Sequence, residues 1–152
     1  MHVRPSIRAA LVGATFALAP AFASAAVTFN EIGFDMPGTD DGKEFIELRG
    51  TPGESLDGLS YVTVEADSGG NIGSVEQVIR LDGLTIGSNG LLLIRDADTV
   101  LQPAPAAGTT VTIRSAELSK DLENDSNNHL LVRNLSASVV PQATSTTLAT
   151  DL

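Results

Sequence analysis

Short apolar runs rich in β-branched residues alternate along this chain with turn residues, and this punctuation restricts the fold more than any other feature of the sequence. The turns combine Gly with Asp, Asn, Ser or Pro and return at a spacing of roughly 8–12 residues. Gly and β-branched residues both disfavour helices. The pattern therefore predicts an all-β sandwich of about seven short strands, with a barrel as the alternative.

The clearest strand is predicted at residues 43–50, where an apolar run stands between two polar turns. Because side chains alternate along a strand, Ile46 and Leu48 are expected on the core face, with Phe45 and Glu47 on the other. Further strands are predicted at 27–34, 60–65, 74–81, 91–95, 109–114 and 130–132. The first should be bulged near Glu31.

Alternation also orients these further strands. Val62 and Val64 are expected to point inward, as are Val111 and Ile113. The continuous apolar run at 91–95 indicates a strand buried on both faces.

The connections carry weaker signals. A helical turn is expected near residues 118–122 and an Ala/Pro linker at 103–108. The tetrapeptide Leu-Asp-Gly-Leu occurs at 56–59 and again at 81–84, with no third copy, so the sequence predicts one turn chemistry used twice and no solenoid.

The N-terminal 25 residues have the layout of a secretory signal peptide. Arg4 and Arg8 precede an apolar stretch broken at Pro20, and Ala23-Ser24-Ala25 is a small-residue cleavage signal. The alternative, a membrane anchor, needs about 20 uninterrupted apolar residues. We therefore expect cleavage after Ala25, a secreted or periplasmic location, and no stable membrane insertion afterwards.

Cleavage would leave 127 residues, the length of one domain. It also removes two arginines, which leaves seven basic against 19 acidic residues and a net charge of −12. So acidic a domain repels phosphate backbones, which argues against nucleic-acid partners. The chain has no Cys, so its fold does not depend on disulfides.

Several segments combine into a family pattern. They are Asn30-Glu31-Ile32 followed by 43–48, the Leu-x-Gly strand at 56–62 with Leu59 in the usual Trp position, the Gly-apolar strand within 84–94, and Glu123-Asn124-Asp125 with 130–132. In this order, over about residues 27–133, they resemble the lamin tail domain family.

The resemblance implies an immunoglobulin-like β-sandwich at 26–134, followed by a low-complexity tail or incomplete last strand at 135–152. The family's usual closing strand has no clear equivalent here, so the expectation is a bacterial secreted member truncated at its C-terminus. Lamin-tail-like domains mostly accompany other domains as interaction modules. The function implied is non-catalytic binding of a protein or cell-envelope partner.

The sequence assigns no catalytic, cofactor-binding or metal residue. Glu44 and Glu47 are three apart on a strand and point to opposite faces, so they do not form a ready acid/base pair. Glu31 and Glu47 are expected to meet across neighbouring strands; the alternative is that Glu47 pairs with Lys43 or Arg49. In both cases the sequence predicts a solvated or ion-paired sheet face. His129 is interpreted as a strand-edge residue, because zinc would need more ligands and no Gly-x-Ser-x-Gly nucleophile elbow is present.

Calcium gives the alternative function, a calcium-stabilised extracellular surface or matrix protein. Carboxylates on flexible loops suit Ca²⁺, although neither acidic loop has the spacing of an EF-hand. The candidate ligands would be Asp35, Asp40 and Asp41 in one loop and Asp121, Glu123, Asn124 and Asp125 in another.

Overall fold

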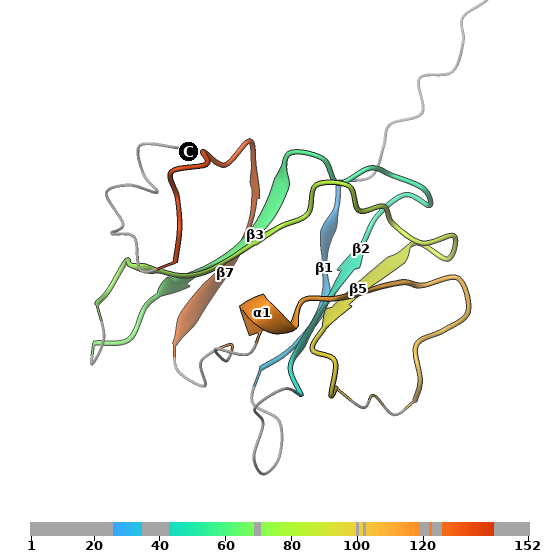
Figure 1. Ribbon diagram of the computed structural model, residues 1–152, viewed down its shortest axis with the longest axis horizontal. Helices are drawn as coiled ribbons and strands as arrows, with labels where there is room; N and C mark the ends of the chain where they lie inside the picture. Colours follow the sequence, from blue (N-terminus) through green and yellow to red (C-terminus); the bar gives the residue numbers. More distant parts are fainter. Residues whose placement is uncertain are drawn as a thin grey trace, which may run out of the picture.

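The computed structural model describes residues 26–34, 43–68, 71–99, 101, 103–118, 122 and 126–141. Within them the chain forms two β-sheets and one short helix (Figure 1). The elements are β1 (Thr28–Gly33), β2 (Phe45–Arg49), β3 (Leu59–Glu65), β4 (Val75–Arg80), β5 (Leu91–Arg95), β6 (Thr110–Ile113), α1 (Ser115–Leu118) and β7 (Asn127–Arg133). The predicted all-β sandwich is confirmed. The helix ends at Leu118, and residues 119–121 of the helical turn expected near 118–122 lie outside the described residues.

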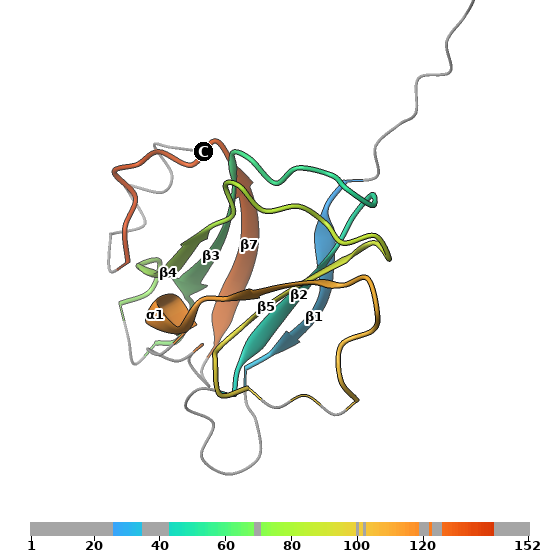
Figure 2. The same cartoon turned by 45° about the vertical axis from the view of Figure 1, so that its right-hand side comes forward.

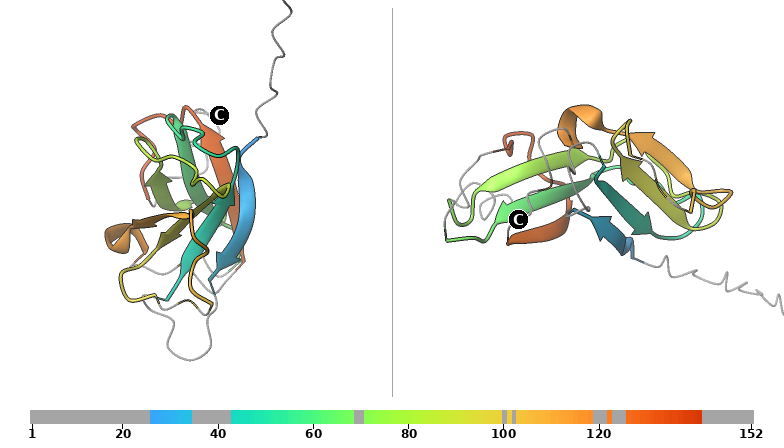
Figure 3. Two further views of the ribbon diagram at one scale, coloured as in Figure 1. Left: turned by 90° about the vertical axis from the view of Figure 1, so that its right-hand side faces the viewer. Right: turned by 90° about the horizontal axis from the view of Figure 1, so that it is seen from below.

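Figure 2 shows the two sheets as separate layers, and Figure 3 shows the same layers from the side and from below. The larger sheet has the order β1-β2-β5-β6, and the smaller has the order β4-β3-β7. Neighbouring strands are antiparallel except for β5 and β6, which run parallel. The predicted leader, residues 1–25, lies outside the described residues. Within the described ranges, no helix has the length and apolar character needed to cross a bilayer.

The main core lies between the two sheets. Ile46 and Leu48 of β2 are completely buried there, as the alternation in the sequence predicted. β5 contributes Leu92 and Ile94 to the same cluster, and Tyr61 faces them from β3. Antiparallel register explains this layer, because Ile46 lies opposite Ile94, and Leu48 opposite Leu92.

The smaller sheet has a second apolar face, and here one prediction was wrong. Val62 and Val64 do not point toward the other sheet; they join a separate cluster on the outer face with Val132. Leu135 and Val139, from the segment after β7, are buried in the same cluster and cover that face. Both faces of β3 are apolar, so alternation alone could not decide which of them meets the other sheet.

The prediction for β6 was also wrong. Val111 and Ile113 are 43% and 50% exposed, while the intervening Thr112 takes the inner face. The parallel register places Thr112 beside the buried Ile94 and Val111 beside Leu93. Because β6 is the last strand of its sheet, its outward residues have no further strand to cover them.

The two Leu-Asp-Gly-Leu turns lie against each other as a reciprocal pair. The Gly58 N–H donates to Asp82 Oδ1 and the Gly83 N–H donates to Asp57 Oδ1, each at 2.8 Å. Both glycines have positive φ, as these tight turns require. The bond from Gly83, together with one from the Ser55 side chain, lowers the pKa of Asp57. The repeat is thus a mutual cap that joins the start of β3 to the end of β4.

Candidate binding cleft

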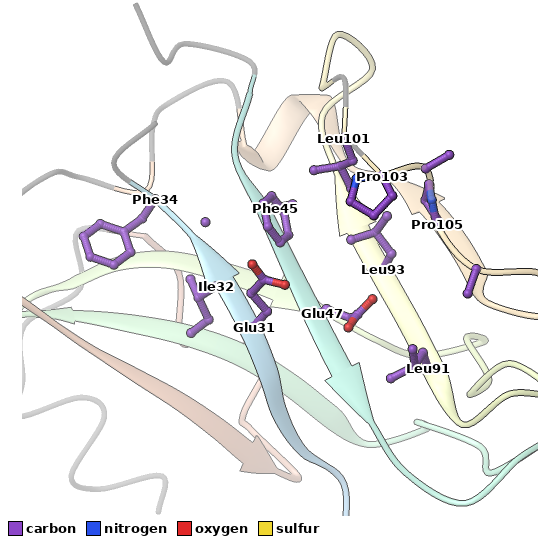
Figure 4. A pocket seen from close by; sticks show the side chains of 13 residues that line it. Glu31, Ile32, Phe34, Phe45, Glu47, Leu91, Leu93, Leu101, Pro103 and Pro105 are labelled. Atoms are coloured by element: carbon purple, nitrogen blue, oxygen red, sulfur yellow. The ribbon is translucent and has the colours of Figure 1, made fainter. Parts of the chain in front are cut away.

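A cleft of about 810 Å³ opens on the outer face of the larger sheet, between β1 and the loop that follows β5. Figure 4 shows this cleft with its lining side chains. Its lining comprises Glu31, Ile32, Gly33, Phe34, Phe45, Glu47, Leu91, Leu93, Leu101, Pro103, Ala104, Pro105 and Ala106. A volume of this size is typical of ligand-binding clefts.

The apolar part of the floor is formed by β2 and β5. Phe45 lies on the outer face, as predicted, and its ring covers Gly33 so closely that a Cβ on Gly33 would clash with Phe45 Cε1. Leu93 is only 1% exposed although it faces away from the core. The wall of the cleft beside Leu93 is formed by Leu101 and by residues 103–106 of the Ala/Pro segment that was predicted as a linker (Figure 4).

Two carboxylates lie side by side on this floor. Glu31 of β1 is directly opposite Glu47 of β2, as expected from the sequence. Side chains opposite one another on antiparallel strands have Cβ atoms about 5 Å apart. Figure 4 shows both carboxylates on the same side of the sheet. The cleft is therefore acidic on one side and apolar elsewhere.

A bulge in β1 shapes this acidic side. The strand register shifts between Phe29 and Glu31, which confirms the predicted bulge and leaves Asn30 as the extra residue. The Asn30 side-chain amide donates to Glu47 Oε1 at 2.5 Å. Bulges re-aim side chains in this way, and here the bulge brings an amide and two carboxylates to one face.

Neither carboxylate has a basic partner in the part of the chain that the structure describes. No Lys or Arg in those ranges forms an ion pair with Glu31 or Glu47. Arg95, which lies opposite Phe45 on the same face, donates instead to the backbone carbonyls of Asp96, Ala97 and Thr99. The prediction was a solvated or ion-paired face. Among the described residues Glu31 is exposed to solvent, Glu47 is half-buried, and neither forms an ion pair.

Glu44 occupies a different environment from Glu47. Its side chain is completely buried and accepts a hydrogen bond from the Leu122 N–H. The two glutamates do lie on opposite sides of the sheet, as their spacing predicted. The burial of Glu44 had no signal in the sequence, because its partner Leu122 lies 78 residues further along the chain.

His129 belongs to an aromatic contact between the edges of the two sheets. Its Nδ1 lies 2.8 Å from the Tyr61 hydroxyl, and the Phe34 ring centroid lies 5.9 Å from its own. Phe29 meets Tyr61 edge-on at 6.0 Å. Burial, with the charge of Glu44, raises the pKa of Tyr61, so its hydroxyl stays protonated. His129 is therefore a structural edge residue, but its bond to Tyr61 had no signal in the sequence.

Comparisons with protein-family models, with curated proteins and with solved structures find no match for this chain. The geometry of the cleft is therefore the basis for inferring a function.

The residues proposed as calcium ligands all lie outside the described residues. They are Asp35, Asp40, Asp41, Asp121, Glu123, Asn124 and Asp125. Among the residues that the structure does describe, no group of three or more His, Asp or Glu side chains is placed to hold a metal ion. The cleft offers only two carboxylates, those of Glu31 and Glu47, beside the Asn30 amide, which is fewer than such a group requires.

The lowered pKa of His129 leads us to expect that the free energy of unfolding depends on pH. Burial lowers this pKa below its ordinary value near 6.5, so the folded protein resists a proton that the unfolded chain accepts. The unfolded state then binds more protons as pH falls through 6.5, and the free energy of unfolding should decrease until the lowered pKa is passed. Urea unfolding at pH 7.5 and 5.0 measures this loss.

The matched variant is His129→Gln, which keeps a hydrogen-bonding side chain but does not titrate. All carboxylates are common to both proteins, so the difference between their pH profiles isolates His129. The wild type should lose more stability between the two pH values than the variant. Equal losses would contradict the burial of a neutral His129.

Proposed function

We propose that this protein is a secreted, non-catalytic β-sandwich module that binds a partner protein at the outer face of its larger sheet. The observation that carries the proposal is the open cleft, with its apolar floor and its pair of adjacent carboxylates. An apolar surface with a few placed polar groups is the composition of a recognition site. The leader-like residues 1–25 support export.

The proposal includes a finer assignment of the fold. We infer an immunoglobulin-like sandwich of the lamin-tail type, supported by the order of the motifs at 30–32, 43–48 and 56–62. Modules of this type act through surfaces and loops, which agrees with a cleft built from a sheet face and the loop after β5.

The proposal is tested with variants in which a Trp side chain fills the cleft. Ala106 lines it from the loop, whereas the neighbouring Ala107 is exposed and does not line it. A library of random peptides is displayed and selected on the wild-type protein. Selected peptides should bind Ala106→Trp at least about tenfold more weakly, because an indole occupies their site, and should bind Ala107→Trp as they bind the wild type.

Melting temperatures of the variants establish that they fold. If Ala106→Trp does not fold, Ala104→Trp fills the same cleft from the other side of Pro105. The proposal is overturned if no selected peptide binds the wild type more tightly than it binds the variant with the filled cleft.

A further inference from the structure

The lining of the cleft specifies the chemistry of its ligand. Two of the 13 lining residues are charged, and both are negative. We propose that the cleft binds an extended segment of the partner protein through a basic side chain, which lies between Glu31 and Glu47 while apolar neighbours pack on Phe34 and Leu101. This inference rests on the proposed function and adds the character of the partner.

The electrostatics of the cleft floor favour a cationic ligand. Like charges directly opposite each other on neighbouring strands are unfavourable, and no Lys or Arg of the described chain pairs with them. The Asn30 amide satisfies one oxygen of Glu47 only. A positive group placed between the two carboxylates removes the repulsion and gains charge-assisted hydrogen bonds. A basic ligand is therefore complementary to this floor.

The spacing of the two carboxylates favours arginine over lysine. A guanidinium carries five N–H donors in one plane and can reach two carboxylates on adjacent strands, whereas an ammonium acts as a single point charge. Arginine is therefore expected to bind more tightly than lysine. Phe34 is 37% exposed at one end of the cleft, and Pro103 and Pro105 stand at the other, so apolar surface flanks the charge on both sides (Figure 4).

The same charges exclude other occupants. A second copy of this chain docking by the same face would bring four carboxylates together, on a protein whose net charge is −10. A phosphate backbone is repelled for the same reason. Proline has no N–H, so Pro103 and Pro105 cannot donate to a ligand backbone, and recognition falls to side chains.

The experiment uses the peptides selected on the wild-type protein. Their sequences should be enriched in Arg beside apolar residues. One labelled peptide is then titrated against the wild type, the double variant Glu31→Gln/Glu47→Gln, and Asp98→Asn, a control that removes an exposed carboxylate outside the cleft. Affinity should fall about tenfold for each cleft carboxylate removed and less than about twofold for the control.

Two further readouts separate recognition of charge from structural damage. Replacing the peptide's Arg with Lys should weaken binding, and replacing it with the neutral isostere citrulline should weaken it more. Without peptide, Glu31→Gln/Glu47→Gln should melt at a higher temperature than the wild type, because the like-charge pair is gone.

Peptides that need the open cleft but bind the double variant as tightly as the wild type would overturn the basic-side-chain inference and leave the binding module intact. A Ca²⁺-dependent rise in melting temperature that is lost in the double variant would assign the pair to a metal ion and overturn it as well. Failure to select any cleft-dependent peptide would instead count against the proposed function.

Discussion

Replacing Gly87 with Ala is expected to destabilise the protein by about 3 kcal/mol or more, since overpacking of rigid structure has costs of this order. A Cβ on Gly87 would clash with Gly108 O, and it would lie 2.5 Å from Thr110 N and 2.7 Å from Leu91 O. All three neighbours are backbone atoms, so no side chain can rotate away. The turn at 87–90 would have to separate from the start of β6, and the parallel pairing of β5 with β6 would be lost. Denaturant unfolding measures the loss of stability, and amide exchange in β6 measures where it occurs.

Gly83→Ala is the matched control. Gly83 has a positive φ of 76°, and no atom lies within 4 Å of the position that an added Cβ would take, so only backbone strain opposes the change. That strain costs roughly 1–2 kcal/mol. If Gly87→Ala lowered the free energy of unfolding no more than Gly83→Ala, the close packing of backbone around Gly87 would be contradicted.

Truncating Leu48 to Ala is expected to cost about 3 kcal/mol, within the range of roughly 2–5 for Leu→Ala in a core. Leu48 is completely buried between the sheets, where Leu92 lies opposite it on β5 and Tyr61 belongs to the same cluster. The backbone on both sides is fixed by strand pairing, so the cavity cannot collapse. Urea unfolding with an unchanged m-value gives the free-energy difference directly.

Val111→Ala tests the orientation of the edge strand. Val111 is 43% exposed, so its truncation should change the free energy of unfolding by no more than about 0.5 kcal/mol, as for other surface positions. Alternation in the sequence predicts the opposite, a buried Val111. A cost for Val111→Ala as large as that for Leu48→Ala would support the buried orientation and contradict the register of β6.

Local pattern was sufficient wherever one face of a strand is clearly apolar. Ile46 and Leu48 were placed correctly because Glu47 between them marks the other face, and the bulge near Glu31 was visible as a shift in phase. Pattern failed for Val62 and for Val111. In β3 both faces are apolar, and in β6 the facing direction depends on a parallel partner that no short-range signal specifies.

The sequence predicted the strand features of the candidate site, namely the outward Phe45 and the bulge near Glu31. The meeting of Glu31 with Glu47 followed from adjacent strands and their register. The cleft itself depends on the loop at 101–106, whose Ala and Pro residues look like a linker in the sequence and become a wall only through their position beside Leu93. The burial of Glu44 and the bond between Tyr61 and His129 join segments 78 and 68 residues apart, beyond the reach of periodicity.

The position of β3 has a consequence for the order in which the domain can assemble. β3 pairs with β4 directly after it, but its other partner, β7, lies 62 to 74 residues further along. Closing so long a loop is slow compared with forming a hairpin. The smaller sheet therefore cannot be completed until almost all of the described chain has been synthesised.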